Sequence, residues 1–272
     1  DEAAFIRFLK IMKAEGIWVC AFTKTSVFAD DERCLEIHGC TSRELAEIVA
    51  KLDVTVLVGF NAIDWDVQEK LVVSKKHNYA CIRNKTLELL AEVGLNKTNP
   101  SRLGLGCSPM THLNVDDMVV IYTYARPRNL SPIITTTMCV GPCKKEADWR
   151  GMTPFEKLPN IYAKICGWNI EHGIWTLDWL RENGIPPYPG MFCCKQIRRG
   201  ACVKLNGDVT FCPGSDKILG NVVKEPMEAV LARSPHFRHT DEKERFCPAK
   251  CGKSLPDTLQ TEVMAKLEKK FR

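Results

Sequence analysis

Residues 42–60 read SRELAEIVAKLDVTVLVGF, a helix-forming pattern followed by a run of apolar and β-branched residues. The helical part extends from Ser42, a residue suited to cap a helix, to Lys51. The run Val54–Phe60 that follows is typical of a buried strand. This stretch therefore predicts a helix followed directly by a strand, which is the repeating element of α/β proteins.

The same rhythm extends to both sides of this stretch. Upstream, Phe5–Met12 has helical periodicity, and Ile17–Phe22 after Gly16 has the pattern of a buried strand. Because strands joined by helices of this length need right-handed crossovers, we expect a parallel sheet and an α/β fold. Four helix–strand pairs suit an open or partial barrel, since a closed one needs eight strands. The downstream pairs are expected at Tyr79–Val93 with Arg102–Cys107, and at Val115–Ala125, capped by Asn114, with Pro132–Thr137.

The composition is that of a folded protein with a large core, since 45% of the 272 residues are hydrophobic and 26% are charged. We expect a cytoplasmic protein without a membrane partner. Neither an apolar run long enough to span a bilayer nor a signal peptide is visible in the sequence. The formal charge of +5 is spread along the chain and does not favour a nucleic-acid partner.

The fourteen cysteines are unevenly distributed. Those in the first two-thirds are scattered, several of them in strand-like runs, where a free thiol packs as a small hydrophobe. Six more follow the turn-rich segment Ile185–Gly190, and clustered thiols in a protein of this kind bind zinc or an iron–sulfur cluster. Only Cys247 and Cys251 form a short pair, whereas zinc ribbons use two such pairs. The six are Cys193, Cys194, Cys202, Cys212, Cys247 and Cys251.

This segment combines a lone cysteine, a Gly-x4-Cys element, a Leu-Gly-Asn element and a Cys-x3-Cys pair. They are, in order, Cys194, Gly207 to Cys212, Leu219-Gly220-Asn221, and Cys247 with Cys251. Together they resemble the SPASM/twitch auxiliary-cluster domain attached to many radical S-adenosylmethionine (SAM) enzymes. The resemblance implies that one auxiliary [4Fe–4S] cluster is bound by Cys194, Cys212, Cys247 and Cys251.

Upstream, the segment Val56–Asn61 and the helix–strand pairs around it look like the later βα units of the radical SAM barrel. The resemblance implies SAM contacts from Gly59, Asn61 and His112, near the carboxyl ends of the strands. For Asn61, a hydrogen bond to a ribose and a turn-forming role both remain open, and His112 is either a pocket residue or an ordinary loop histidine. The expected organisation is a partial barrel (1–140), connecting helices and a linker (141–192), a small Cys-rich α+β twitch domain (193–255) and a C-terminal helix (256–272).

The function that this resemblance implies is radical chemistry. A [4Fe–4S] cluster cleaves SAM to a 5′-deoxyadenosyl radical, which initiates an oxidative modification of a peptide or small-molecule substrate. The auxiliary cluster relays an electron or shapes the pocket, and a flavodoxin or ferredoxin is the expected reductant. The family's Cys-x3-Cys-x2-Cys motif is absent from this sequence. We therefore expect the chain alone to be inactive, with the motif in an upstream segment. The alternative is a non-catalytic four-cysteine module, holding zinc or an iron–sulfur cluster, that recruits a peptide or protein.

The dipeptide Asn206-Gly207 predicts a two-residue hairpin turn. In that register Leu205 pairs with Asp208, and Cys202 lies opposite Phe211, on the face away from Cys212. Cys202 is therefore expected not to bind the cluster. Cys193 and Cys194 both remain possible as the fourth ligand, and the family's spacing favours Cys194.

Overall fold

The computed structural model describes residues 3–72, 78–108, 110–134, 136, 154–185, 201–210, 213, 217–233 and 258–272. The chain divides into two compact units, Asp1–Ile134 and Thr135–Arg272, called here the first and the second unit. No helix in the described ranges is long and apolar enough to cross a membrane.

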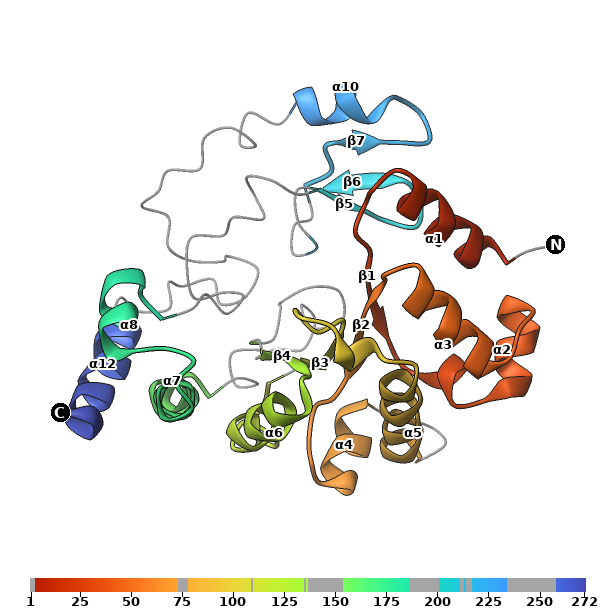
Figure 1. Ribbon diagram of the computed structural model, residues 1–272. Helices are drawn as coiled ribbons and strands as arrows, with labels where there is room; N and C mark the ends of the chain where they lie inside the picture. Colours follow the sequence, from red (N-terminus) through yellow and green to blue (C-terminus); the bar gives the residue numbers. More distant parts are fainter. Residues whose placement is uncertain are drawn as a thin grey trace. The chain divides into compact units, whose positions relative to one another are not determined.

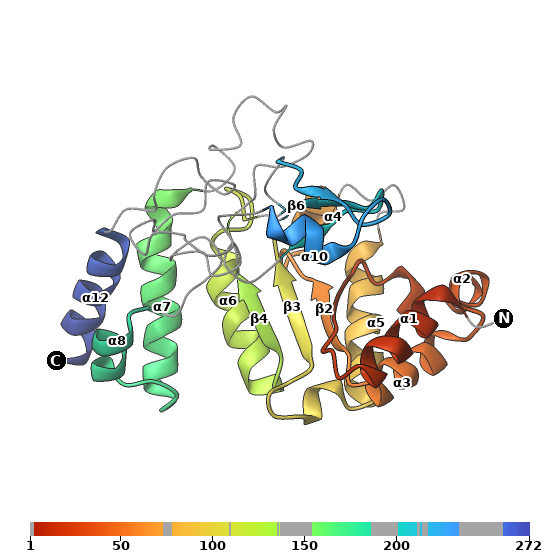
Figure 2. The same ribbon diagram turned by 90° about the horizontal axis from the view of Figure 1, so that it is seen from above.

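A parallel sheet of four strands forms the centre of the first unit (Figure 1). The strands follow one another across the sheet in chain order, and Figure 2 shows β2, β3 and β4 side by side. The parallel α/β fold expected from the sequence is confirmed at this level. The strands are β1 (Cys20–Thr23), β2 (Thr55–Gly59), β3 (Leu103–Cys107) and β4 (Ser131–Ile134).

The helices of the first unit cover one face of this sheet. Right-handed crossovers that all step in the same direction place their helices on the same side, and Figure 1 shows α3, α5 and α6 along that side. The helices are α1 (Ala4–Ala14), α2 (Asp31–His38), α3 (Ser42–Lys51), α4 (Trp65–Val72), α5 (Tyr79–Glu92) and α6 (Asp117–Ala125), with 3-10 turns at Ser26–Phe28, Leu95–Lys97 and Arg126–Arg128. The sequence pattern did not predict α2 and α4.

The two faces of the sheet differ sharply. On one face Val56 pairs with Leu103 and Val58 with Leu105, and all four side chains are at most 1% exposed, so this face forms the core beneath the helices. The opposite face carries Gly59 and Gly106 as a matched pair, and Phe22 on this face is 74% exposed.

Several boundaries differ from the sequence expectation. Thr41, not Ser42, caps α3, because its hydroxyl accepts a hydrogen bond from the Glu44 N–H while the Glu44 carboxylate accepts one from the Thr41 N–H. Likewise α6 begins at Asp117 and not directly after Asn114, which serves a different purpose described below. The strand β1 is shorter than Ile17–Phe22 at its beginning and extends one residue further. The strand β4 begins one residue earlier than predicted, at Ser131, and the predicted end at Thr137 lies outside the described residues.

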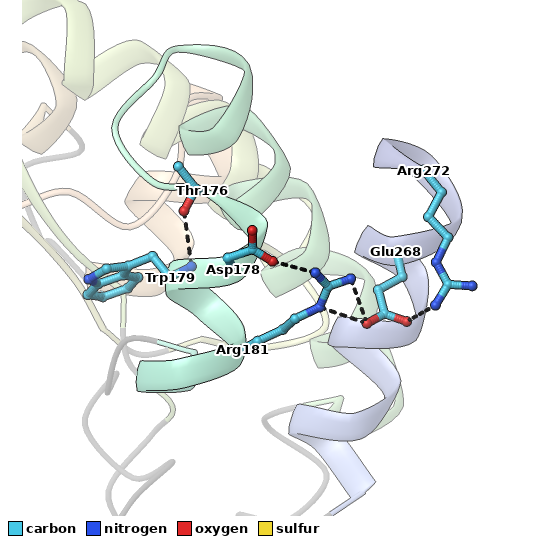
Figure 3. A network of polar contacts seen from close by, with 6 residues as sticks. All are labelled: Thr176, Asp178, Trp179, Arg181, Glu268 and Arg272. Atoms are coloured by element: carbon cyan, nitrogen blue, oxygen red, sulfur yellow. Dashed lines mark hydrogen bonds and ion pairs between the residues drawn. The ribbon is translucent and has the colours of Figure 1, made fainter.

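Three helices of the second unit pack together. They are α7 (Leu158–Glu171), which follows a 3-10 turn at Phe155–Lys157, α8 (Leu177–Asn183) and α12 (Thr258–Phe271). Gly167 of α7 faces α12, since a methyl group there would make an ordinary contact with the Phe271 ring at 3.6 Å. Arg181 joins α8 to α12, since its guanidinium bonds to Asp178 and to Glu268, which also pairs with Arg272 (Figure 3).

A small antiparallel sheet with an adjoining helix forms another part of the second unit. Its strands β5 (Cys202–Val203), β6 (Asp208–Thr210) and β7 (Gly220–Asn221) lie in chain order, and α10 (Met227–Ala232) packs on β7. In β5 and β6, Cys202 pairs with Thr210 and Val203 with Val209. The predicted pairing of Leu205 with Asp208 is therefore wrong by one residue.

Candidate functional site

The carboxyl ends of the four strands meet at one edge of the first unit's sheet. Gly59 ends β2 beside Gly106 of β3, and Cys107 at the end of β3 pairs with Ile134 of β4. Parallel sheets present ligand-binding groups at this edge because the loops that follow the strands converge there. The loops after β1, β2 and β3 each carry polar groups at this edge. The segment Met138–Gly141, expected to follow the fourth strand, lies outside the described residues.

The loop after β2 is held by a glutamine and an arginine from the following helices. Gln68 of α4 accepts hydrogen bonds at its Oε1 from the Asn61 N–H (2.8 Å) and the Ala62 N–H (3.1 Å). Arg83 of α5 donates from its Nη1 to the Ala62 carbonyl and to the same Gln68 oxygen, both at 2.8 Å. Both side chains are buried, Gln68 fully and Arg83 to 2% exposure. The backbone polar groups of this loop are thus satisfied inside the protein.

Arg83 is a buried cation supported by neutral groups. Its guanidinium carbon lies 3.7 Å from the centre of the Phe60 ring, and its Nε donates to Asn84 Oδ1 at 3.1 Å. None of the carboxylates in the described ranges forms an ion pair with it. Burial lowers the pKa of Arg83 to about 10, so the side chain stays charged at neutral pH. The positively charged Arg83 side chain therefore orders the loop after β2 through its hydrogen bonds to Ala62 and Gln68.

Asn114 connects the loops after β2 and β3. Its Nδ2 donates to the Asn61 carbonyl at 2.7 Å, while its Oδ1 accepts from the Thr111 N–H at 2.7 Å and from the Thr111 hydroxyl at 3.2 Å. The side chain is 1% exposed. The sequence predicted Asn114 as a helix cap, but the structure uses it as a bridge between two loops, because α6 begins three residues later.

Asn61 is the most constrained of the predicted site residues. Its backbone N–H and carbonyl are both occupied, and its side chain is 5% exposed. The Asn61 Oδ1 lies 3.5 Å from Gln68 Nε2, a long contact, and within the described part of the chain Asn61 Nδ2 has no hydrogen-bond partner. Since the surrounding loop is fixed, this amide has spare capacity to bind a ligand.

Gly59 and His112, the other two predicted SAM contacts, lie in different environments. The Tyr79 hydroxyl donates to the Gly59 carbonyl at 3.0 Å and lies 2.7 Å from the place where a Gly59 side chain would begin, so a larger residue there would have to displace this hydroxyl. Desolvation raises the pKa of Tyr79, which keeps this hydroxyl protonated. His112 is exposed in the turn before α6 and bonds to none of the described residues. The structure thus brings Gly59 and Asn61 together but leaves His112 at the surface.

A hydrogen bond from helix α5 also holds the loop after β1. Thr25 adopts the left-handed conformation (φ 72°) and is 1% exposed. Its N–H donates to Thr23 Oγ1 at 2.9 Å, and its carbonyl accepts from the Thr86 hydroxyl of α5 at 3.2 Å. Since Arg83 and Thr86 both belong to α5, one helix orders the loops after β1 and β2.

We expect the bridge at Asn114 to be important for stability. Replacing Asn114 by alanine leaves the Asn61 carbonyl and the Thr111 N–H buried without partners, so the free energy of unfolding should fall by about 2–3 kcal/mol. Urea denaturation followed by circular dichroism measures the change. His112→Ala, two residues away and exposed, is the matched control and should change the free energy of unfolding by less than about 0.5 kcal/mol. Equal effects from the two variants would contradict the assignment.

The predicted metal ligands Cys194, Cys212, Cys247 and Cys251, and the alternative Cys193, lie outside the described residues. Among those described, no group of three or more His, Cys, Asp or Glu side chains is arranged to hold a metal ion. Cys202 is half-buried in β5 and faces the same side as Thr210. The predicted position of Cys202 on the face away from Cys212 required the other register, and the observed pairing with Thr210 does not support it.

Two motif elements of the hairpin meet in space. Gly207 has φ +83°, and a side chain on it would begin 2.6 Å from Val223 and 2.8 Å from the Asn221 side chain. Asn221 Nδ2 donates to the Asn206 carbonyl and to Asp208 Oδ1, both at 3.0 Å. These bonds, with one from Asn206, lower the pKa of Asp208. The Gly-x4-Cys and Leu-Gly-Asn elements therefore depend on each other sterically.

Comparison with known proteins adds no family assignment. No protein-family model matches the chain, and no curated protein matches it.

Proposed function

We propose that the chain is the later part of a radical SAM barrel followed by a twitch-type auxiliary-cluster domain. Two features of the first unit support this. The parallel strands follow one another in chain order, as they do in a βα barrel. The polar loops lie at the carboxyl edge, where such barrels place their chemistry. Asn61 and Gly59 are then the residues of this chain that face the SAM molecule.

The observation that carries the proposal is the contact between Gly207 and Asn221. Gly207 lies five residues before Cys212, and Asn221 is the asparagine of the Leu-Gly-Asn element. The two residues depend on each other, since any side chain at Gly207 would collide with Asn221. The antiparallel strands β5 and β6 and the helix α10 surround this contact. This explains why the two sequence elements that resemble the twitch domain occur together.

The donor set of the second unit fits an iron–sulfur cluster. Four thiolates complete the coordination of one [4Fe–4S] cluster, and in the proposed assignment they come from Cys194, Cys212, Cys247 and Cys251. When bound, such a cluster supplies one-electron redox chemistry. The contribution of the described residues is positional: Gly207 and Asn221 fix the turn that leads towards Cys212, and Arg233 pairs with Glu225 beside β7.

The activity is tested by a longer chain that adds an upstream segment with a Cys-x3-Cys-x2-Cys motif. We expect this longer chain, reconstituted anaerobically and reduced with dithionite, to release 5′-deoxyadenosine from SAM. The 272-residue chain should release none, because it lacks the ligands for the reactive cluster.

The control for this experiment replaces the three added cysteines by alanine and keeps everything else. Loss of 5′-deoxyadenosine with retention of the auxiliary iron supports the enzyme. An open reading frame that begins near Asp1, or a longer chain that binds SAM-cluster iron and releases no 5′-deoxyadenosine, would favour the binding module instead.

A further inference from the structure

The turn between α2 and α3 brings two cysteines together. Cys34 lies in α2, and Cys40 follows Gly39, which ends the helix in the left-handed conformation (φ 70°). The Gly39 N–H donates to the Leu35 carbonyl at 2.9 Å. In helix ends of this kind the residue after the glycine packs against a residue in the preceding turns of the helix. In this helix the residue after the glycine is Cys40, and Cys34 lies in the preceding turns.

The two thiols are neighbours, and neither has a covalent partner. The side chains of Cys34 and Cys40 interact with each other, and both are free thiols. Cys34 is fully buried, whereas Cys40 is half-buried and can be reached from solvent. The pair therefore has one thiol that a reagent can approach and one held behind it.

The backbone on both sides of the turn is fixed. The Ser42 N–H donates to Asp31 Oδ1 at 2.8 Å, and the Ser42 hydroxyl donates to the Val27 carbonyl at 2.9 Å. Thr41 and Glu44 form the capping box of α3. Because these bonds hold the beginning of α3 against α2, the thiols stay close together, which raises the effective concentration of one for the other.

We propose that Cys34 and Cys40 form a reversible disulfide that ties the end of α2 to the beginning of α3. With oxidised glutathione as the oxidant, the Cys40 thiolate attacks one glutathione sulfur and releases one reduced glutathione. The Cys34 thiolate then attacks the Cys40 sulfur and releases the second. The two cysteines lose two electrons and two protons, and the glutathione disulfide gains both the electrons and the protons as it becomes two molecules of reduced glutathione.

The reaction is slow at neutral pH. Desolvation raises the pKa of Cys34 to about 12, with smaller contributions from Cys40, Asp31 and Glu44, and desolvation also raises the pKa of Cys40. Below the pKa of the attacking thiol, the thiolate fraction rises about tenfold for each pH unit. The initial rate of disulfide formation should therefore rise steeply between pH 7 and pH 9.

Trypsin isolates the pair in one peptide. It cleaves after Arg33 and Arg43, and the peptide 34–43 contains Cys34 and Cys40 and no other cysteine. The folded chain is treated with oxidised glutathione, the remaining thiols are alkylated, and the peptides are weighed by mass spectrometry. We expect peptide 34–43 without alkylation and lighter than its reduced form by two hydrogen atoms.

Two controls keep the test sharp. In Cys34→Ser, a glutathione should remain attached to Cys40, because no second thiol can displace it. In urea the turn is lost and the two thiols are no longer held together. The concentration of reduced glutathione needed to reduce the disulfide should then fall by about tenfold or more. A stable glutathione adduct at Cys40 in the unmodified folded chain, or equal reopening in the folded and unfolded chains, would overturn the proposal.

Discussion

Replacing Gly104 by alanine should destabilise the first unit by about 3 kcal/mol, because the new methyl group has no space. It would lie 2.6 Å from the Ser131 carbonyl oxygen of the neighbouring strand, and it would overlap Leu57 Cδ2. A carbonyl within the sheet cannot move without breaking the pairing of β3 with β4. Urea denaturation followed by circular dichroism gives the change in the free energy of unfolding.

Gly106→Ala is the matched control for this experiment. Gly106 lies two residues later on the same strand and the same face, but a methyl group there meets only the Val58 carbonyl oxygen at 3.8 Å and a Phe22 ring carbon at 4.0 Å. We expect the free energy of unfolding to change by less than about 0.5 kcal/mol. If the two variants were equally stable, the register of β2, β3 and β4 would be wrong.

The second large effect concerns the fourth cysteine ligand. The family's spacing favours Cys194, so Cys194→Ala should lose most of the bound iron after anaerobic reconstitution, while Cys193→Ala keeps it. Cys202→Ala is the informative comparison. Because Cys202 pairs with Thr210, its position on the hairpin does not exclude it as a cluster ligand. We expect Cys202→Ala to retain its iron, since the four ligands proposed above are complete without it.

The measurement is iron and sulfide per chain in the three variants, each compared with the unmodified protein purified in parallel. Retention of iron in Cys194→Ala with loss in Cys202→Ala would move the fourth ligand onto β5. Loss in all three would indicate that the variants do not fold, which circular dichroism of the variants would reveal.

The sequence predicted the regular elements well where the pattern was long. Residues 42–60 form α3 and β2 as expected, because a full amphipathic helix and a buried strand leave little choice of conformation. The helices α2 and α4 were missed. Each has only eight residues, too few to be stable alone, so their helical state depends on tertiary packing that a local pattern does not contain.

The register of the hairpin differs from the prediction because of the conformation of Asn206. The type I′ turn that Asn-Gly favours needs positive φ at both central positions, and of Asn206 and Gly207 only Gly207 has it. The Asn206 side chain instead bonds to Asp208, and Lys204 pairs with Asp208 across a three-residue loop. The dipeptide thus signalled a hairpin correctly but left its loop length undetermined.

The candidate site was only partly predictable. Asn61 and Gly59 were identified from their place after a strand, but Gln68 and Arg83, which hold the loop, were missed. Arg83 did leave a signal, since it occupies a position in the buried stripe of α5 between Ala80 and Leu87. The bridge from Asn114 to Asn61 joins residues 53 positions apart, so it became visible only in the folded chain.

The central claim is that the second unit carries an iron–sulfur cluster, and its most direct test is the iron and sulfide content of the 272-residue chain reconstituted anaerobically. The account predicts about four iron and about four sulfide per chain, as four thiolates complete one [4Fe–4S] cluster. One zinc per chain with no sulfide would contradict it.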